Sequence, residues 1–411
     1  MAATDPTGPE GGADTAEQVD AEREGAARVD AEPAGAELAV DERAGGDAEP
    51  VVDVMLSGMV FFDIVFTGFP HPPAPGTEVW TGGMGSSPGG IANLAVATAR
   101  LGLRTALAAA FSDDLYGDWM WQVLSEQEHI DLSASRRQSG WHTPVTVSLA
   151  VEADRAMVTH GHPPPHSVTA ALHRPPSAAS VLVDLGDPAT REQHWWRRAA
   201  AEGALVFADA GWDPEQTWDP AVLRALEGCH AFIPNAAEAM GYTRTDTPDR
   251  ALAALAELVP LAVVTDGAAG VAAIDHSTGE REQIPALTVE LTDATGAGDV
   301  FAASLVAGTL RGWPLRQRLR FAALCSALAV QQFGGSLAAP GWGDLADWWH
   351  LVQARASTGD PVAERTRAEH AFMGDALAGA DTRRVRRAEA TIARFSDADT
   401  PATCPQRPPG G

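Results

Sequence analysis

The sequence DATGAGD occupies residues 293–299, and the apolar stretch VFAASLVAG follows it at residues 300–308. The apolar stretch predicts a buried helix, and the small residues before it predict a turn at the helix N-terminus. Gly296 and Gly298 can expose backbone N–H groups because they carry no side chain. A helix N-terminus holds unpaired N–H donors and a partial positive charge, so this turn is suited to bind an anion.

Asp299 stands out in this turn, because a carboxylate beside an anion site is repelled by the anion. It fits there if it accepts a proton from a hydroxyl that attacks the anion. Phosphoryl transfer needs such a base together with fixed donors for the phosphate, which Gly296, Ala297 and Gly298 would supply. The alternative is a glycine-containing loop with an Asp that only caps the helix.

Composition excludes several classes of protein. The chain has 411 residues, 45% of them hydrophobic, which is enough for one large domain or two ordinary ones. Its net charge of −26 argues against a nucleic-acid groove, since such surfaces are basic. The chain contains no lysine, which excludes a P-loop, a Schiff-base mechanism and a phosphate site held by Lys. Arg, backbone amides and a metal ion must therefore carry any phosphate chemistry.

The three cysteines, Cys229, Cys325 and Cys404, are scattered and odd in number. They predict a reducing compartment, with neither a disulfide framework nor a zinc site. No apolar run reaches the length of a membrane span, and the N-terminus lacks the order of a signal peptide. We therefore expect a cytoplasmic enzyme with no membrane partner and no nucleic-acid partner.

The two ends of the chain differ from its middle. Residues 1–50 hold 14 acidic residues against 3 Arg and almost no large apolar side chains, which predicts a disordered acidic tail. We expect residues 51–345 to form the main domain. Residues 346–411 are rich in Ala, Arg and Glu and then in Pro and Gly, and they predict a partly helical C-terminal tail.

The middle of the chain has the pattern of a parallel sheet covered by helices. Residues 51–58 predict a buried strand, and strand and helix patterns alternate over residues 175–275. Asp63 follows the first strand, and Asp209 ends a later one. Open α/β sheets bind ligands at the carboxyl ends of their strands, so both are candidates for ligand contacts. For Asp63, the alternative is a turn residue.

A second glycine-rich stretch, PGGIANLAVATARLG, lies at residues 88–102. Its glycines predict the start of a helix that ends at Gly102. Gly89 and Gly90 would lie at the helix start, and Asn93 would be a polar residue on the helix face that looks into the crevice. Asn93 could instead cap the helix.

The stretch NAAE at residues 235–238 follows a predicted strand and starts a helix. Mg²⁺ prefers water and a few carboxylates as ligands. Glu238 lies one turn from Asn235 and could orient a hydrated Mg²⁺. The alternative is a plain helix start with a capping Asn and a Glu in the first turn.

The heptad at residues 293–299 resembles the C-terminal signature of the PfkB/ribokinase family of carbohydrate and nucleoside kinases, D-[TS]-x-G-A-G-D. Ala294 stands where Thr or Ser is common. The stretch at residues 88–102 resembles the family's G-G-x-x-x-N-x-A signature with a shift of one residue, so Gly90 stands where ribokinases carry Lys. Residues 235–238 resemble its N-x-x-E motif, and residues 263–270 resemble its T-x-G-x-x-G loop.

This resemblance implies a ribokinase-like three-layer α/β/α sandwich with a mostly parallel central sheet. A small β lid would come from about residues 61–87 and 143–162. It implies ATP and Mg²⁺ as cofactors, a monovalent cation such as K⁺ as a further one, and a homodimer in some members. Asp299 would be the general base. The acceptor would contact Asp63, Gly89, Gly90 and Asn93; the nucleotide would contact Asn235, Thr265, Gly267, Asp293 and Thr295; the metal would be held at Glu238.

The acceptor stays open at this point. A small sugar or sugar-like alcohol is the first choice. A nucleoside is the second, because Phe61 stands where ribokinases carry a polar Asn and makes that wall apolar. A phosphosugar is disfavoured, since no Arg lies in the matched acceptor motifs. A catalytically silent sugar or nucleotide sensor is the alternative of another class, and the presence of Asp299 and Glu238 argues against it.

Overall fold

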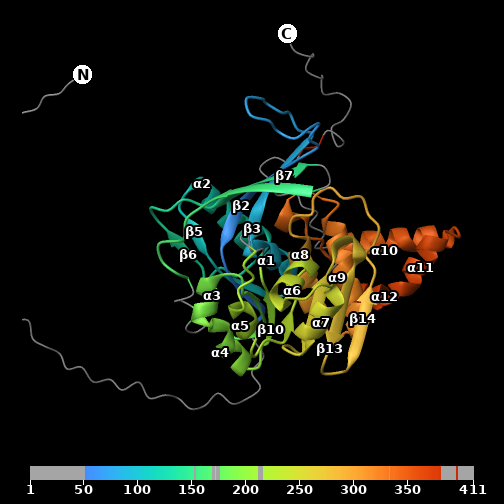
Figure 1. The fold of residues 1–411 in the computed structure, drawn as a ribbon. Helices are drawn as coiled ribbons and strands as arrows, with labels where there is room; N and C mark the ends of the chain where they lie inside the picture. The colour runs from blue at the N-terminus through green and yellow to red at the C-terminus, as the bar shows by residue number, and fades with distance from the viewer. Residues whose placement is uncertain are drawn as a thin grey trace, which may run out of the picture. The chain divides into compact units, whose positions relative to one another are not determined.

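The computed structural model describes residues 51–380, apart from residues 152–153, 169–171, 173–175, 212–215 and 333, and also residues 395–396. The predicted acidic tail at residues 1–50 lies outside the described residues, as does most of the chain after residue 380. Figure 1 shows the described part as a main sheet covered by helices, with a smaller sheet beside it.

The main sheet has eight strands in the order β14-β13-β12-β11-β10-β9-β1-β4. The strands from β4 to β12 run parallel, and β13 and β14 add an antiparallel hairpin at one edge. Parallel strands are buried on both faces, which explains their Val, Leu, Ala and Phe residues. The strands are β1 (Val52–Ser57), β4 (Thr105–Ala108), β9 (Ala178–Asp184), β10 (Leu205–Asp209), β11 (Ala231–Phe232), β12 (Leu261–Thr265), β13 (Val271–Asp275) and β14 (Glu280–Ile284).

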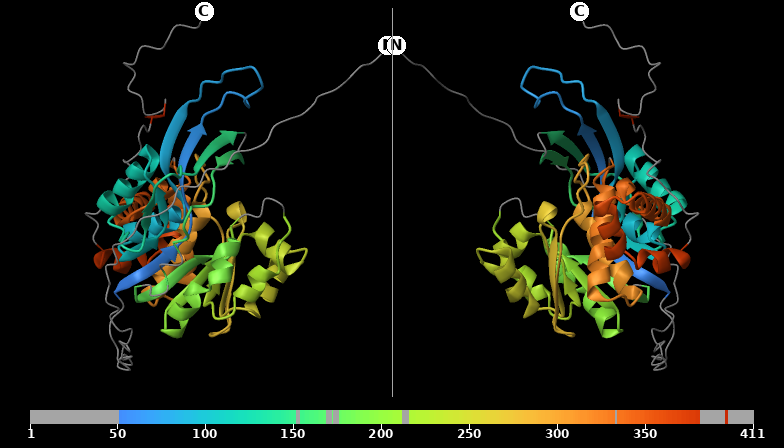
Figure 2. Two further views of the ribbon diagram at one scale, coloured as in Figure 1. Left: turned by 90° about the vertical axis from the view of Figure 1, so that its left-hand side faces the viewer. Right: turned by 90° about the vertical axis from the view of Figure 1, so that its right-hand side faces the viewer.

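Helices cover both faces of this sheet (Figure 2). Alternate residues of β1 point to opposite faces, so Met55 and Leu56 belong to two separate apolar clusters. The Leu56 cluster holds α1 (Ile91–Arg100), α8 (Ala297–Leu310), α9 (Leu315–Ala329) and α10 (Trp342–Ser357). The Met55 cluster holds α4 (Trp195–Ala201), α5 (Ala221–Ala225), α6 (Ala236–Thr243) and α7 (Pro248–Ala256). The predicted three-layer α/β/α sandwich is confirmed.

The shorter helices are α2 (Leu115–Gln122), α3 (Pro188–Gln193), α11 (Pro361–Glu369) and α12 (Met373–Ala378). The expected domain boundary at residue 345 falls inside α10. Trp349 of α10 and Met373 of α12 are buried in the same cluster as α1 and α8. Residues up to about 380 therefore pack on the main domain.

The small predicted β sheet is present. Its strand order is β15-β3-β2-β7-β8, with β2 (Val60–Thr67), β3 (Gly83–Gly90), β7 (Val145–Val151), β8 (Asp154–His160) and β15 (Phe395–Ser396). We call these strands the lid sheet. A separate pair, β5 (Ala110–Ser112) and β6 (Arg136–Gln138), lies beside α2.

One local expectation was wrong. Asp63 lies inside β2 of the lid sheet, not directly after β1, because the chain turns at Gly58 and starts a new strand at Val60. The predicted helix start at Gly89 and Gly90 is confirmed, because Gly90 is the N-cap of α1; the same two glycines also end strand β3, which pairs with β2 along its whole length.

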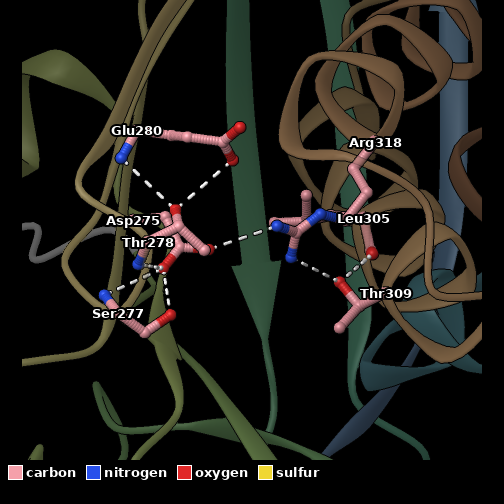
Figure 3. A network of polar contacts seen from close by, with 7 residues as sticks. All are labelled: Asp275, Ser277, Thr278, Glu280, Leu305, Thr309 and Arg318. Carbon is pink, nitrogen blue, oxygen red and sulfur yellow. Dashed lines mark hydrogen bonds and ion pairs between the residues drawn. The ribbon is translucent and has the colours of Figure 1, made fainter.

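A buried ion pair joins the edge hairpin to α8 and α9 (Figure 3). Arg318 of α9 donates to the carboxylate of Asp275 at 3.2 Å and to Thr309 of α8 at 3.5 Å. Burial raises the pKa of Asp275, but hydrogen bonds from Ser277 and Arg318 outweigh it and hold that pKa below its usual value. The network helps to fix the direction of α8, whose N-terminus carries the candidate site.

Candidate active site

The N-terminus of α8 is built for close approach of a ligand. Gly296 is the N-cap with φ of 77°, a conformation that favours glycine. Val300 donates its N–H to Gly296 O at 2.9 Å, and Ala297 donates to Ala294 O at 3.3 Å. The N–H of Gly298 has no acceptor within the helix at this position. A Cβ built on Gly298 would meet no atom of the described residues within 4 Å. The backbone at Gly298 therefore faces open space, whereas a Cβ on Gly296 would lie 3.3 Å from Gly335 Cα.

Asp299 meets Asn93 at this end of α8. Asn93 Nδ2 donates to Asp299 Oδ2 at 2.9 Å, across 206 residues of sequence. The contact forms because α1 and α8 pack against each other in one apolar cluster. The structure thus brings together the predicted base and one predicted acceptor contact.

Asp63 lies against the glycines that end β3. A Cβ on Gly89 would lie 1.9 Å from Asp63 Oδ2, so only glycine fits at this position. Gly90 has φ of 63°, and a Cβ there would lie 2.4 Å from Met59 O and 2.7 Å from the Phe61 ring. Gly89 and Gly90, two of the residues predicted to contact the acceptor, therefore pack directly on β2.

Three buried polar atoms surround Gly335 without hydrogen-bond partners in the described part of the chain: Ser87 Oγ, Asn93 Oδ1 and Thr295 Oγ1. A Cβ on Gly335 would lie 3.0 Å from Asn93 Oδ1 and 3.4 Å from Ser87 Oγ. Buried polar groups are normally satisfied, so unsatisfied ones call for an explanation. Their position beside the Asn93–Asp299 contact is suited to a small polar group of a ligand.

The loop that carries Gly335 is held from several sides. Asp293 accepts from Thr295 N at 2.9 Å and from Gly334 N at 3.2 Å, so it joins the two turns. Arg100 donates to Leu337 O at 2.8 Å and to Ala339 O at 2.7 Å. Arg100 is also paired with Glu128 at 2.8 Å, and both side chains are almost fully buried. The sequence predicted that Asp293 contacts the nucleotide, and it did not predict that Asp293 connects these two turns.

The predicted nucleotide residues form a second group. Asn235 and Thr265 are bridged in parallel, and Thr265 donates its N–H to Pro234 O at 3.1 Å. Asn235 and Glu238 form a reciprocal capping box, with Asn235 N donating to Glu238 Oε2 at 2.9 Å and Glu238 N to Asn235 Oδ1 at 3.0 Å. Gly267 has φ of 46° in a tight turn that directly follows Thr265 and Asp266. The capping arrangement named as the alternative is thus present.

A cleft of about 650 Å³ opens beside Asp299. Its lining includes Phe61 and Gly90 of the lid sheet, Asp184 of β9, Arg191 of α3 and Tyr242 of α6. Asp184 and Arg191 were not predicted. Asp184 ends β9 as Asp209 ends β10, so the rule that ligands bind at the carboxyl ends of parallel strands would have found it.

Carboxylates crowd this edge of the sheet. Burial is the main cause that raises the pKa of Asp209 well above its usual value, and repulsion from Glu238, Asp299 and Asp184 adds to it. Burial likewise raises the pKa of Asp184 and of Glu238. Carboxylate oxygens, together with water, are the ligands that Mg²⁺ prefers. The donor set therefore fits a hydrated divalent cation.

Comparison with known proteins gives the family. Residues 69–341 match the description "pfkB family carbohydrate kinase". The chain belongs to this family. The region of this pfkB kinase that matches the family includes Asp299 and all other residues of the α1 and α8 motifs described above.

Individual relatives of this pfkB kinase act on different acceptors. It is 30% identical over 301 residues to a fructokinase from Klebsiella pneumoniae, a match that covers 63% of this chain and 90% of that one. It is 27% identical over 298 residues to a nucleoside kinase from Methanothermobacter thermautotrophicus, covering 71% and 94%. The ribokinase of Arabidopsis thaliana, solved with ribose and ATP, has the same fold, with a TM-score of 0.59, 22% identity and coverage of 71% and 96%.

The part of the chain that the structure describes contains no helix with the length and apolar character needed to cross a bilayer.

Proposed function

We propose that this pfkB kinase transfers the terminal phosphoryl group of ATP to a hydroxyl of a small sugar or sugar-like alcohol. The observation that carries the proposal is Asp299. It is held by Asn93 at 2.9 Å, one residue beyond a glycine that faces open space at a helix N-terminus. A base and a set of fixed N–H donors at one point are what this transfer requires.

The chain's own residues divide the work as follows. Asp63, pressed against Gly89, and Asn93 orient the acceptor, and Asp299 accepts the proton of its attacking hydroxyl. The N–H groups at the start of α8 hold the transferred phosphate, with Gly298 the open position. The lid sheet limits access of water above the acceptor. Positioning and charge stabilisation supply most of the rate, as is general for phosphoryl transfer.

Mg²⁺ would be held through water at the carboxylate group of Asp184, Asp209 and Glu238, and it would neutralise the phosphate charge. Glu238 can do this without leaving its capping box, since a carboxylate has two oxygens and accepts several hydrogen bonds. Asn235, Thr265 and Gly267 would lie along the nucleotide, and the loop between Asp293 and Thr295 would border it.

A nucleoside acceptor is the second candidate, and Phe61 favours it. Its ring packs over Gly90 and lines the cleft, which gives that wall an apolar surface on which a base could lie. The nucleoside kinase among the relatives supports this candidate, as the fructokinase supports a sugar.

The test is an ADP-release assay with ATP and Mg²⁺ across a panel of hexoses, pentoses and nucleosides. We expect release above the acceptor-free rate for one class, with a transferred phosphate on that acceptor by mass spectrometry. Release for nucleosides alone would replace the sugar proposal. If no member of the panel is phosphorylated although ATP and a panel member bind, the chain is a silent sensor and the proposal is wrong.

A further inference from the structure

Three histidines meet on the surface of the lid, away from the cleft. His142 precedes β7, His160 ends β8, and His162 follows two residues later. A ring nitrogen of each lies within 4.8 Å of those of the other two, and all three side chains are exposed. The rings of His142 and His160 lie parallel at 5.1 Å, and His162 stands on edge to both at 5.3 Å.

Strand pairing explains why these residues meet. β7 and β8 are antiparallel, with Val145 opposite His160, so the chain before β7 runs beside the chain after β8. His160 and His162 are two residues apart and share one side of the extended chain. Gly161 between them packs against Pro144, where a Cβ would lie 2.7 Å from Pro144 Cβ. The juxtaposition follows from the fold of the hairpin.

The segment that carries His142 is held in place by its neighbours. Thr143 donates its N–H to Asp114 Oδ2 at 2.7 Å and its hydroxyl to Asp114 Oδ1 at 2.7 Å. Trp141 Nε1 donates to His162 O at 3.0 Å, and this bond directly joins the segment before β7 to the segment after β8. His142 Nδ1 lies 3.2 Å from Thr143 O. With its proton on Nδ1, His142 presents Nε2 as a ligand, the arrangement usual for histidines that bind metal.

We propose that His142, His160 and His162 form a site for a transition-metal ion of the Zn²⁺ class, which ties together the two ends of the lid hairpin. Imidazole nitrogen suits Zn²⁺, Co²⁺, Ni²⁺ and Cu²⁺ and does not suit Mg²⁺. Bonds of about 2.0–2.1 Å to nitrogen are reached from the observed spacing by small rotations of exposed rings. The net charge of −26 favours cations near the surface. The number and spacing of the cysteines argued against a zinc site, but the site proposed here has histidine ligands and needs no cysteine.

The site is tested with the full chain, free of any histidine tag, titrated with Co²⁺ in excess Mg²⁺ so that carboxylate sites are filled. We expect one Co²⁺ per chain with a visible absorption band, which is lost when Zn²⁺ displaces the Co²⁺. His160→Ala and His142→Ala should each weaken binding at least about tenfold. His276→Ala, an exposed histidine on the β13–β14 turn, is the control and should change nothing.

The proposal is overturned if the unsubstituted chain binds no Co²⁺, if both cluster variants bind as tightly as it does, or if His276→Ala weakens binding equally. Hydrogen exchange tests separately whether the bound metal links the two ends of the lid hairpin. Zn²⁺ should slow hydrogen exchange at the amides of β7 and β8 in the unsubstituted chain and not in His160→Ala. Unchanged exchange with bound Zn²⁺ would contradict it. None of these measurements depends on phosphoryl transfer, so they stand apart from the proposed activity.

Discussion

Two helix N-termini at the same edge of the main sheet carry a carboxylate at the same position and use it differently. In α6, Asn235 is the N-cap and Glu238 is the third helical residue, and the two bond each other's backbone N–H groups. In α8, Gly296 is the N-cap and Asp299 is the third helical residue, but its oxygen accepts from Asn93 of α1. The first helix start is closed by its own side chains, and the second is left open.

A third helix shows that a glycine N-cap alone does not produce the open form. α10 starts at Gly341, and its third residue, Asp344, turns back to accept from Gly341 N at 2.9 Å. At α8, the packing of α1 places an amide donor beside Asp299. What distinguishes the candidate site is therefore the partner across the helix pair, which no local sequence pattern reveals.

Exchanging the second residue of each helix sharpens this comparison. Gly298→Ala adds a methyl group where the protein leaves open space, so the fold should tolerate it while the anion position fills. We expect kcat/KM to fall about a hundredfold. The change should leave the melting temperature unchanged or slightly higher, since Ala favours helix.

Ala237→Gly is the matched change in α6. It should lower stability by about 0.5–1 kcal/mol and leave the rate unchanged. Equal values of kcat/KM for the unsubstituted enzyme and Gly298→Ala would show that no ligand occupies the α8 turn.

Gly89→Ala examines the acceptor side. The new Cβ would overlap Asp63 Oδ2, so that carboxylate must move. A displacement of about 1 Å at a positioning residue can lower the reaction rate about a hundredfold. We expect the effect to be a higher KM for the acceptor, with the affinity for ATP unchanged. Gly374→Ala, at an exposed position of α12, is the control for a glycine change without contacts. An unaltered KM in Gly89→Ala would remove Asp63 from the acceptor site.

Of these changes, Asp209→Asn is expected to have the smallest effect, and the effect is on thermal stability. The raised pKa of Asp209 means that the folded state holds the proton more tightly than the unfolded state. Its contribution to stability is complete below pH 3.8 and is lost as the pH rises through the raised value. The variant should therefore melt a few degrees higher than the unsubstituted chain at pH 7.5 without Mg²⁺, with a smaller gap at pH 4.5. A variant that melts lower at pH 7.5 would contradict the crowding of carboxylates.

Strong periodic patterns made the main elements predictable. The alternation over residues 175–275 predicted the parallel strands, and the apolar run after the heptad predicted α8. Strand β3 escaped prediction because residues 83–90, GMGSSPGG, have low strand propensity and become a strand only by pairing with β2. Strand β2, in contrast, was predictable, because residues 60–67, VFFDIVFT, are rich in aromatic and β-branched residues, and this pattern includes Asp63.

The site was predictable where a motif was complete and unpredictable where the partner came from elsewhere. The heptad pointed to Asp299, but the bond from Asn93 depends on how α1 packs on α8. Thr295 was assigned to the nucleotide, but its grouping with Ser87 and Asn93 around Gly335 depends on a loop anchored by the buried Arg100. These contacts join segments more than 200 residues apart, and no spacing rule reaches that far.

The central claim is that Asp299 serves as the base, whereas Glu238 at the same helix position does not. The most direct measurement compares Asp299→Asn with Glu238→Gln, each replacing a carboxylate by its amide, for phosphorylation of the best acceptor and for ATP binding by calorimetry. We predict that Asp299→Asn lowers kcat by about 10²–10⁴-fold and binds ATP as the unsubstituted enzyme does. Glu238→Gln should keep a kcat closer to normal at high Mg²⁺. A kcat for Asp299→Asn within a few fold of the unsubstituted enzyme would contradict the account.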